Sequence, residues 1–436
     1  MTMWQSILSP DQVSGDSEDF EDLVHQRIIR AFSEANLSGL AKDQAQTAVE
    51  QAIRRLLAEE YANIIGDAKE ELVSRLTDEI IGLGPIEPLI RDPEVSEIMV
   101  NSPAEVYVER EGVIYETDVK FKNQAHLMRV IERITVALGR HVDDASPMVD
   151  ARLADGSRVN VIIPPLVPSS PVLTIRKFRS DLFSIDELVQ TGTMSHGMGE
   201  FFKSCVRAKL NTVVSGGTGT GKTTLLNALS AFIPLAERII TIEDPLEIKL
   251  QQKHVISMEG RPPSVEGAGE VTQRMLLRNA LRMRPDRIII GEVRGPEAFD
   301  MMQAMNTGHE GSLTTVHANS ARDALARIEN MVLMAGFELP VLVIREQMAS
   351  ALHLIIQLAR LFDGSRRVVS VSEVSGMEGN IVTMQEIFTF HQENIDENGR
   401  VIGELRPTGL RPQFTDRLRA FGVEPSEDLF GVERWT

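Results

Sequence analysis

The 436-residue sequence predicts an α/β protein, with a parallel sheet in its C-terminal half, an α+β region before it, and a helical extension at the start. From Gly197 onward, apolar strand-like runs alternate with stretches of helical periodicity, which is typical of a parallel sheet covered by helices. A glycine-rich loop at 216–224 separates one of these strands from the next helix. Hydrophobic residues make up 42% of the chain and charged residues 25%, so we expect a soluble globular protein with large cores.

Charge and cysteine content narrow the class of protein. A net charge of −18 argues against a protein that coats nucleic acid or anionic lipid, because both need a basic surface. The single cysteine, Cys205, leaves no internal disulfide and no cysteine-ligated zinc. Residues 1–10 lack the pattern of a signal peptide, and polar residues interrupt the longest apolar stretch, 348–362. We therefore expect a cytoplasmic protein without a membrane span.

The N-terminal part is expected to be helical. Residues 1–18 are polar and acidic and predict a disordered tail. Within 19–81, three segments at about 20–35, 42–65 and 67–81 show helical spacing of apolar residues. The region carries no catalytic signature. It is therefore interpreted as a small bundle that packs on a neighbouring domain or docks a partner.

An α+β domain is expected over 82–178, beginning at Gly82-Leu83-Gly84-Pro85, and a linker over 179–196. The expected elements are a helix at 86–90, a strand at 95–100, a hairpin at 106–115 turning at Glu111-Gly112, a helix at 124–139, a hairpin at 151–161, a strand at 172–178 and a short linker helix at 185–190.

The remaining residues, 197–436, predict the α/β domain. Its expected elements are a helix at 201–209, a strand at 212–215, the glycine loop and its helix, a strand at 238–245, a helix at 271–282, and strands at 287–294 and 312–317. The last three strands end in polar residues. Because an open parallel sheet binds ligands beyond the carboxyl ends of its strands, we expect these residues to face the glycine loop.

The glycine loop has the spacing of a phosphate-binding loop. It reads Gly216-Gly217-Thr218-Gly219-Thr220-Gly221-Lys222-Thr223-Thr224 between a strand and a helix. Glycines let backbone N–H groups converge on phosphate, and the helix N-terminus adds partial positive charge. Lys222 is expected to reach the β- and γ-phosphates, and the Thr223 hydroxyl to ligate Mg²⁺.

Two of the strands end in carboxylates. Glu292 follows an apolar strand of Walker B type, so we expect it to hold magnesium directly or through water. Glu243 is our candidate for the base that polarises the attacking water, with Asp244 and Glu247 in support. The sequence gives no distances, so the division of roles between Glu243 and Glu292 stays open.

Histidines and arginines complete the candidate site. His317 ends the third strand, and we expect it to contact the γ-phosphate; His309, in Thr307-Gly308-His309-Glu310-Gly311, is a second candidate. A metal held by this pair is less favoured, because no third ligand is evident. The site also needs charge compensation beyond one lysine. We expect it from three arginines of the α+β domain, acting within the chain or in a neighbouring subunit: Arg152, Arg158 and Arg176.

Four ordered motifs carry a resemblance to a known family. They are the Walker A loop, Thr241-Ile242-Glu243-Asp244-Pro245 (an Asp box), Gly291-Glu292-Val293-Arg294 (Walker B) and Thr315-Val316-His317-Ala318-Asn319 (a His box). Over roughly residues 70–390 the chain resembles the type II/type IV secretion ATPase superfamily. The segments Gly82-Leu83-Gly84-Pro85-Ile86-Glu87-Pro88-Leu89 and Glu97-Ile98-Met99-Val100-Asn101 look like the CpaF-type branch, which drives tight-adherence (Tad) pili.

The resemblance implies a RecA-like C-terminal domain joined by a flexible linker to an α+β, PAS-like N-terminal domain. It implies a homohexameric ring that hydrolyses ATP between these domains and acts from the cytoplasm on an inner-membrane platform protein, with membrane association only through partners. In the family the Asp-box glutamate is the base, which supports Glu243, and N-terminal arginines contact nucleotide. The four-cysteine zinc motif of other branches is absent, and the extension at 19–80 lies outside the shared core.

Two other classes of protein stay open at this point. A nucleic-acid motor could use a similar core, although the net charge of −18 and the absence of a basic aromatic stripe argue against it. A nucleotide-gated scaffold with little turnover is the other class, and the paired strand-end acids argue against that. We therefore expect a pilus or secretion motor ATPase that binds no nucleic acid.

Overall fold

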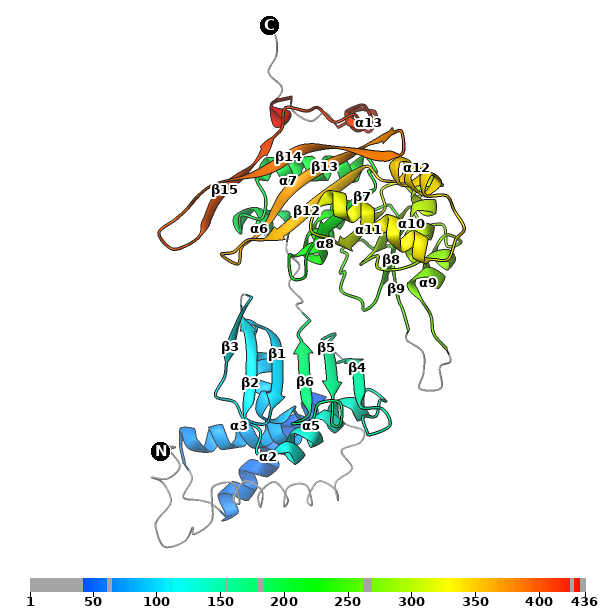
Figure 1. Cartoon of the computed structure of the whole chain (residues 1–436). Coiled ribbons are helices and arrows are strands. Elements are labelled where there is room, and N and C mark those ends of the chain that lie inside the picture. The colour runs from blue at the N-terminus through cyan, green and yellow to red at the C-terminus, as the bar shows by residue number, and fades with distance from the viewer. Residues whose placement is uncertain are drawn as a thin grey trace. The chain divides into compact units, whose positions relative to one another are not determined.

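The computed structural model describes residues 42–60, 65–110, 112–153, 155–178, 184–261, 269–423 and 427–431. Contacts divide the chain into a first unit, Met1–Arg179, and a second unit, Ser180–Thr436, each with its own cores (Figure 1). The expected tail at 1–18, the expected helix at 20–35 and Glu111 of the expected turn lie outside the described residues.

The extension of the first unit contains two helices, α2 (Lys42–Glu60) and α3 (Asp67–Ile80). Their apolar side chains recur every three or four residues, so each helix has one apolar stripe. The stripes pack together and are fully or nearly fully buried: Val49, Ile53 and Leu57 on α2, and Leu72, Val73 and Leu76 on α3. Both predicted helices are confirmed, and α2 ends at Glu60, before residues 61–64, which lie outside the described part.

The end of α3 is fastened to the α+β part of the same unit. Arg133 Nη1 donates hydrogen bonds to the Glu79 and Gly82 carbonyls at 2.7 and 2.6 Å. The His126 Nε2 atom lies 2.7 Å from Glu79 Oε1. The extension therefore packs on its neighbouring domain, as one of the two interpretations of the sequence predicted.

The α+β part consists of a six-stranded antiparallel sheet in the order β3-β2-β1-β6-β5-β4. Its elements are η2 (Gly84–Ile86), α4 (Glu87–Arg91), β1 (Val95–Ser102), β2 (Glu105–Arg110), β3 (Val113–Glu116), α5 (Gln124–Ala137), β4 (Met148–Arg152), β5 (Arg158–Ile162) and β6 (Val172–Arg176). Helix α5 shares a core with alternate residues of β1, β2, β5 and β6, whereas the side chains of β3 are exposed. All the expected elements of this domain are present.

The second unit is built on a nine-stranded sheet in the order β15-β14-β13-β12-β7-β11-β10-β8-β9. Its strands are β7 (Thr212–Gly216), β8 (Ile239–Glu243), β9 (Val255–Glu259), β10 (Arg287–Ile290), β11 (Leu313–His317), β12 (Leu354–Arg360), β13 (Arg366–Glu378), β14 (Ile381–Ile395) and β15 (Val401–Pro407). The strands from β12 to β9 pair in parallel, and β13 to β15 add an antiparallel part that the sequence did not predict (Figure 1).

Helices cover both faces of this sheet, so the second unit has two cores. The neighbouring residues Val213 and Val214 belong to different cores because successive strand side chains point to opposite faces. The helices are α6 (Ile185–Gln190), α7 (His196–Arg207), α8 (Lys222–Ser230), α9 (Gln273–Ala280), α10 (Glu297–Asn306), α11 (Ala321–Met334), α12 (Val341–Ala351), α13 (Thr415–Ala420) and η3 (Glu427–Phe430). Leu188 and Met194, from the expected linker, belong to one of these cores.

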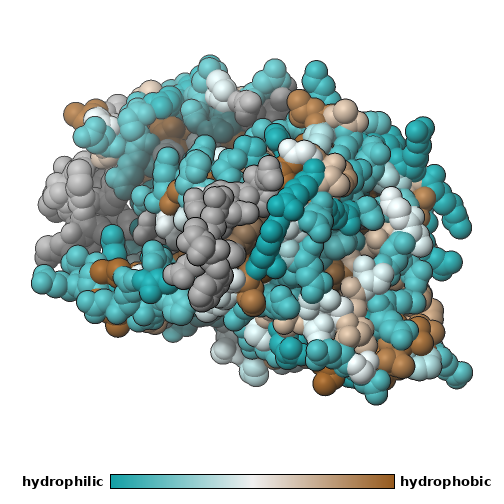
Figure 2. Space-filling view, turned by 90° about the horizontal axis from the view of Figure 1, so that it is seen from above, coloured by the Kyte–Doolittle hydropathy of each residue, from teal (hydrophilic) through white to brown (hydrophobic). Residues whose placement is uncertain are grey.

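The visible surface is hydrophilic and most of the longest apolar stretch is packed inside the protein, as the composition led us to expect. The face seen in Figure 2 is mainly hydrophilic, and its apolar residues lie in small groups. The stretch 348–362 contains the end of α12 and strand β12, both packed in the second unit. Among the described residues, no helix is both long and apolar enough to cross a membrane.

The C-terminal segment completes one core of the second unit through a phenylalanine cluster. Phe201 of α7 lies at the centre, with its ring centroid 5.4 Å from Phe388, 6.3 Å from Phe414 and 5.8 Å from Phe430. Phe414 and Phe430 come from the chain beyond β15. Such ring pairs add to the free energy gained by burial. The described residues after β15 that carry Phe414 and Phe430 are therefore part of the folded domain.

We predict that Phe201→Ala lowers the free energy of unfolding of the second unit by about 3–5 kcal/mol, because it removes the ring at the centre of the cluster. Phe362→Ala is the matched control, since that side chain is 67% exposed, and should cost less than about 0.5 kcal/mol. Urea unfolding followed by circular dichroism measures both. Equal costs would contradict the central role of Phe201.

Candidate functional site

The glycine loop joins β7 to α8, as the sequence predicted. At Gly216 a Cβ atom would lie 2.5 Å from Thr220 Oγ1 and 2.9 Å from the Leu358 carbonyl, so no larger residue fits there. Gly221 precedes α8 with φ of 92°, a left-handed conformation that favours glycine. Serine or threonine side chains cap α7, α9 and α11, but no side chain caps α8. The N–H groups at the start of α8 therefore suit an anion.

Lys222 is the first residue of α8 and directly follows the glycines of this loop. Its Nζ atom donates a hydrogen bond to the Gly217 carbonyl at 2.8 Å, and Thr220 Oγ1 donates to the same carbonyl at 2.9 Å. The Lys222 hydrogen bond holds its ammonium group against the backbone of the glycine loop. Thr223 and Thr224 follow in the same turn and are half-buried.

Four adjacent parallel strands bring the four sequence motifs to one edge of the sheet. In the order β7, β11, β10 and β8, the strands lead into the glycine loop, His317, Glu292 and Glu243. His317 is the register partner of Gly216, and Ile290 that of Ile242. The edge of the sheet expected to bind ligands therefore carries a lysine, a histidine and two carboxylates.

Hydrogen bonds to Thr315 of β11 fix the position of Glu292, which lies two residues beyond the end of β10. The N–H of Val293 donates to the Thr315 carbonyl at 2.9 Å, and Thr315 Oγ1 donates to the Gly291 carbonyl at 2.7 Å. These bonds flank Glu292 on both sides. Its side chain is half-buried.

Glu243 occupies a different environment, since its side chain is buried at the end of β8. Its Oε2 atom accepts hydrogen bonds from the N–H groups of Glu247 and Ile248 at 2.7 and 2.8 Å. Its Oε1 atom is buried and has no hydrogen-bond partner within the described part of the chain. Burial raises the pKa of Glu243 to about 7, and the Glu247 carboxylate acts in the same direction, while the two backbone bonds and the Thr241 hydroxyl oppose it. The carboxyl group is therefore poised to exchange a proton near neutral pH.

The residues around Glu243 link the Asp box to the Walker B segment. Asp244 forms an ion pair with Arg294, two residues after Glu292. At Gly291 a Cβ atom would lie 2.9 Å from Glu243 Cγ, so only glycine leaves room for the carboxylate. Glu247, the other expected supporting acid, donates its N–H to Glu243, and the charge of its carboxylate helps to raise the Glu243 pKa.

His317 is half-buried beside the glycine loop. Burial lowers its pKa, and the Lys222 ammonium lowers it further, although the Glu292 carboxylate acts in the opposite direction. At neutral pH the ring is therefore uncharged, with one nitrogen that donates and one that accepts.

His309 lies at the other edge of the sheet. It precedes β11, whose first and last residues, Leu313 and His317, are about 13 Å apart at 3.3 Å per residue. Its neighbours Gly311 and Ser312 donate to Asn211 Oδ1, before the start of β7. Within one chain, the structure does not bring His309 to the glycine loop, contrary to our expectation.

The three arginines of the first unit form a row. Arg152, Arg158 and Arg176 are consecutive register partners across β4, β5 and β6. Arg176 Nε lies 3.5 Å from Glu97 Oε1, and the Arg152 guanidinium lies 5.9 Å from the Phe178 ring centre. Because register partners share one face of a sheet, the row concentrates positive charge on a small area. Their expected contact with nucleotide stays a prediction.

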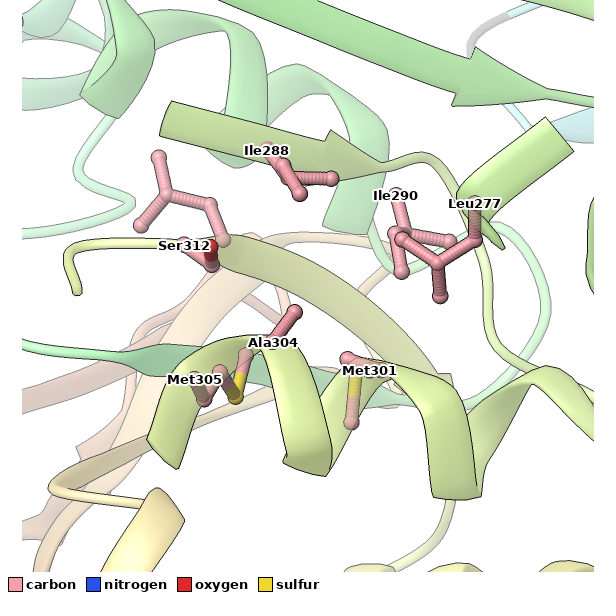
Figure 3. Close-up of a pocket in the computed structure, with 8 residues that line it drawn as sticks. Leu277, Ile288, Ile290, Met301, Ala304, Met305 and Ser312 are labelled. Atoms are coloured by element: carbon pink, nitrogen blue, oxygen red, sulfur yellow. The ribbon is translucent and has the colours of Figure 1, made fainter. Parts of the chain in front are cut away.

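A pocket of the second unit lies away from these motifs (Figure 3). It lies between α9, α10, β10 and β11, where Met301, Ala304 and Met305 of α10 point toward Ile288 and Ile290. It offers no room for a water molecule and is lined by apolar side chains and Ser312. This space is part of the core and offers no groups for phosphate chemistry.

The structure adds one residue that our reading of the sequence missed. At Gly221 a Cβ atom would lie 3.7 Å from Cδ of Arg366, the first residue of β13. The Arg366 side chain therefore lies next to the phosphate-binding loop. Nothing in the local sequence places it there, because the contact depends on the pairing of β12 with both β7 and β13.

The fold and this edge define an α/β protein with a phosphate-binding loop and strand-end acids. Residues 79–402 match the family model described as "Type II/IV secretion system protein", about three quarters of the chain. The chain belongs to this family.

The names of similar proteins are consistent with membership of this family. The chain is 34% identical over 324 residues to a putative conjugal transfer protein of Mycobacterium tuberculosis, covering 73% of this chain and 91% of the relative. It is 34% identical over 316 residues to the conjugal transfer protein TrbB of Rhizobium radiobacter, covering 71% and 91%. It is 32% identical over 328 residues to the type IV secretion system protein VirB11 of Bartonella quintana, covering 66% and 91%.

Solved structures of secretion ATPases are also similar. The VirB11 ATPase of Brucella suis shares 29% identity, with a TM-score of 0.36, over 66% of this chain and 94% of its own. The ATPase DotB of Legionella pneumophila shares 17% identity, with a TM-score of 0.45, over 65% and 78%. The assignment to the family rests on the sequence matches.

We predict that Glu243 makes stability depend on pH. Its folded pKa of about 7 lies above the ordinary 4.5, so the folded state binds the proton more tightly and the free energy of unfolding falls as pH rises from 4.5 to 7. Above pH 7 the buried Glu243 carboxylate lowers the free energy of unfolding by the full amount, about 3 kcal/mol. As pH rises from 4.5 to 8, the free energy of unfolding of Glu243→Gln should therefore increase by about 3 kcal/mol relative to that of the wild type.

Urea unfolding at the two pH values measures this difference. Glu397→Gln, which replaces an exposed carboxylate in the β14–β15 turn, is the control and should show no such change. A Glu243→Gln effect that is the same at both pH values would contradict the raised pKa.

Proposed function

We propose that this protein is an ATP-hydrolysing motor of a secretion or pilus-assembly apparatus. The observation that supports this most strongly is the single sheet edge where four adjacent strands end in the glycine loop, His317, Glu292 and Glu243. Phosphoryl transfer to water needs a phosphate cradle, a metal, an oriented water and positive charge. This edge offers side chains suited to each part. Members of the family named above as ATPases support the same activity.

The proposed cofactors are ATP and Mg²⁺, and the residues fit them. The uncapped start of α8 and the loop glycines suit the phosphates, with Lys222 on the β- and γ-phosphates. The Thr223 hydroxyl and the Glu292 carboxylate are oxygen ligands, which Mg²⁺ prefers. A bound magnesium ion would neutralise charge on the β- and γ-phosphates.

Glu243 is the proposed base. Its pKa of about 7 suits a group that must take a proton from water at neutral pH. Its buried Oε1 atom makes no hydrogen bond of good geometry with the described residues, so a water molecule that entered beside it would find an acceptor. The uncharged His317 ring would donate to the γ-phosphate, and the arginine row on β4, β5 and β6 would supply further charge, in the same chain or a neighbour.

The assembly and partner are part of the proposal. We infer a homohexamer with a RecA-like ATPase domain and a PAS-like N-terminal domain, acting at the cytoplasmic face of the inner membrane on a platform protein. The Gly82–Leu89 and Glu97–Asn101 segments favour the Tad pilus branch, while relatives named as conjugal transfer and type IV secretion proteins favour the wider family. The net charge of −18 argues against nucleic acid as a partner.

We predict that Lys222→Ala abolishes ATP hydrolysis, because it removes the cation that bridges the β- and γ-phosphates. Phosphate release with Mg-ATP measures turnover, and light scattering with a non-hydrolysable ATP analogue measures assembly. Lys253→Ala, at an exposed site before β9, is the matched control and should retain full activity. Full activity in Lys222→Ala would overturn the assignment of the phosphate loop.

We predict that Glu243→Gln binds ATP with little change but loses at least about 100-fold in turnover, because the base is gone. Glu292→Gln should raise the Mg²⁺ concentration needed for half-maximal activity, because one metal contact is weakened. Magnesium titrations of both variants separate the roles. A magnesium defect in Glu243→Gln with normal turnover at saturation would show that the two roles are reversed.

A further inference from the structure

A buried glutamine links the end of β11 to β12, across the strand that leads into the phosphate loop. Strand β7 lies between β11, which ends at His317, and β12, which carries Gln357. The Gln357 side chain is buried, with 4% of the residue exposed. Its Nε2 atom donates to the Ala318 carbonyl at 3.2 Å and to the Leu358 carbonyl at 3.3 Å. One amide group therefore joins the residue after His317 to β12.

Both carbonyl groups that Gln357 binds are next to parts of the proposed site. His317 is the last residue of β11 that pairs with β7, so the bond to Ala318 holds the chain just beyond that pairing. Leu358 is the register partner of Gly216, the first glycine of the loop. The amide therefore connects the segment that carries His317 to the strand that supports the glycine loop.

The residue of β7 that lies between these groups is small. Ser215 is the register partner of Gln357 on β12 and of Val316 on β11. Register partners on neighbouring strands point to the same face, and Val316 and Ala318 belong to the core on that face. Ser215 is fully buried, and its hydroxyl has no hydrogen-bond partner among the described residues. Its small side chain therefore leaves room for the Gln357 side chain to reach Ala318 across β7.

Only the donor half of the Gln357 amide makes hydrogen bonds. Its Oε1 atom is buried and has no hydrogen-bond partner in the part of the chain that the structure describes. A buried polar atom without a partner costs free energy, and an apolar side chain of similar size would avoid that cost. The glutamine is therefore suited to this position by the two bonds of its Nε2 atom.

We propose that Gln357 is a positioning residue that keeps the His317 ring at the phosphate loop. It does not contact the nucleotide. It holds the Ala318 backbone toward β12, and this backbone in turn fixes the direction of the preceding His317 side chain. Without the amide, His317 would meet the γ-phosphate in the wrong orientation more often. This inference rests on the proposed contact between His317 and the γ-phosphate.

The test is titration calorimetry of the full chain with a non-hydrolysable Mg-ATP analogue and with Mg-ADP. Gln357→Met keeps an unbranched side chain and removes the amide. It should weaken the analogue about fivefold, because a hydrogen bond to the γ-phosphate is partly lost, and leave Mg-ADP within about twofold. His317→Ala should weaken the analogue at least as much. Adding Gln357→Met to His317→Ala should weaken it no further, because both changes remove the same contact.

Gln252→Met is the matched control. Gln252 is also buried, its Nε2 atom donates to the Ser230 and Ile233 carbonyls at 2.8 and 3.2 Å, and its Oε1 atom lacks a partner among the described residues. These contacts lie at the opposite end of α8 from the loop, so this variant should bind both nucleotides normally. Circular dichroism shows whether each variant is folded. Gln357→Leu, which also lacks the amide, is used in the same way if Gln357→Met does not fold.

The outcomes separate this inference from the proposed function. Normal analogue binding by folded Gln357→Met, with weak binding by His317→Ala, would overturn this inference alone. A further loss in the double variant would also overturn it, since Gln357 would then act independently of His317. An equal loss of analogue and Mg-ADP affinity in Gln357→Met would overturn it as well, because the glutamine would then support the whole loop. Normal analogue binding by Lys222→Ala would instead overturn the proposed function.

Discussion

The parallel pairing of β7, β11, β10 and β8 is the constraint on which the site depends. A slip of one residue along any of these strands would turn every side chain to the opposite face. Gly216 and Gly291 allow the strand ends to come this close, since a Cβ at either would collide with Thr220 or Glu243. The register thus fixes the loop, the histidine and both carboxylates together, and no single motif could form the site alone.

At the opposite edge, where the parallel strands begin, arginine side chains hold the sheet together. Arg287, at the start of β10, is fully buried and donates to Glu237 Oε2 at 2.5 Å and to the Gly311 carbonyl at 3.1 Å. Arg417 of α13 donates to the carbonyls of Ala208 and Lys209, just before β7. Removing either guanidinium would leave buried polar groups without partners. Among the described residues, each edge still has a buried polar atom without a hydrogen-bond partner: His309 Nδ1 at this edge and Glu243 Oε1 at the ligand edge.

The sequence predicted the elements that are determined by the pattern of neighbouring residues. Spacing identified the glycine loop and its helix, and apolar runs identified β8, β10 and β11. It missed β13 to β15 and Arg366, because their positions depend on pairing between segments far apart in the chain. His309 was misjudged for a simpler reason. A residue that precedes a parallel strand lies at its amino end, so the order of His309 before β11 already argued against the ligand edge.

The sequence left the roles of Glu243 and Glu292 open, and their environments now argue for different ones. Mg²⁺ prefers oxygen ligands, which suits the half-buried Glu292 carboxylate near the His317 ring. A base must exchange a proton near neutral pH, which suits Glu243, whose burial raises its pKa to about 7. The two N–H bonds to Oε2 fix the carboxylate while leaving Oε1 available. The two carboxylates at the ends of neighbouring strands thus lie in different environments, because the same end of the sheet buries Glu243 and leaves Glu292 half-buried.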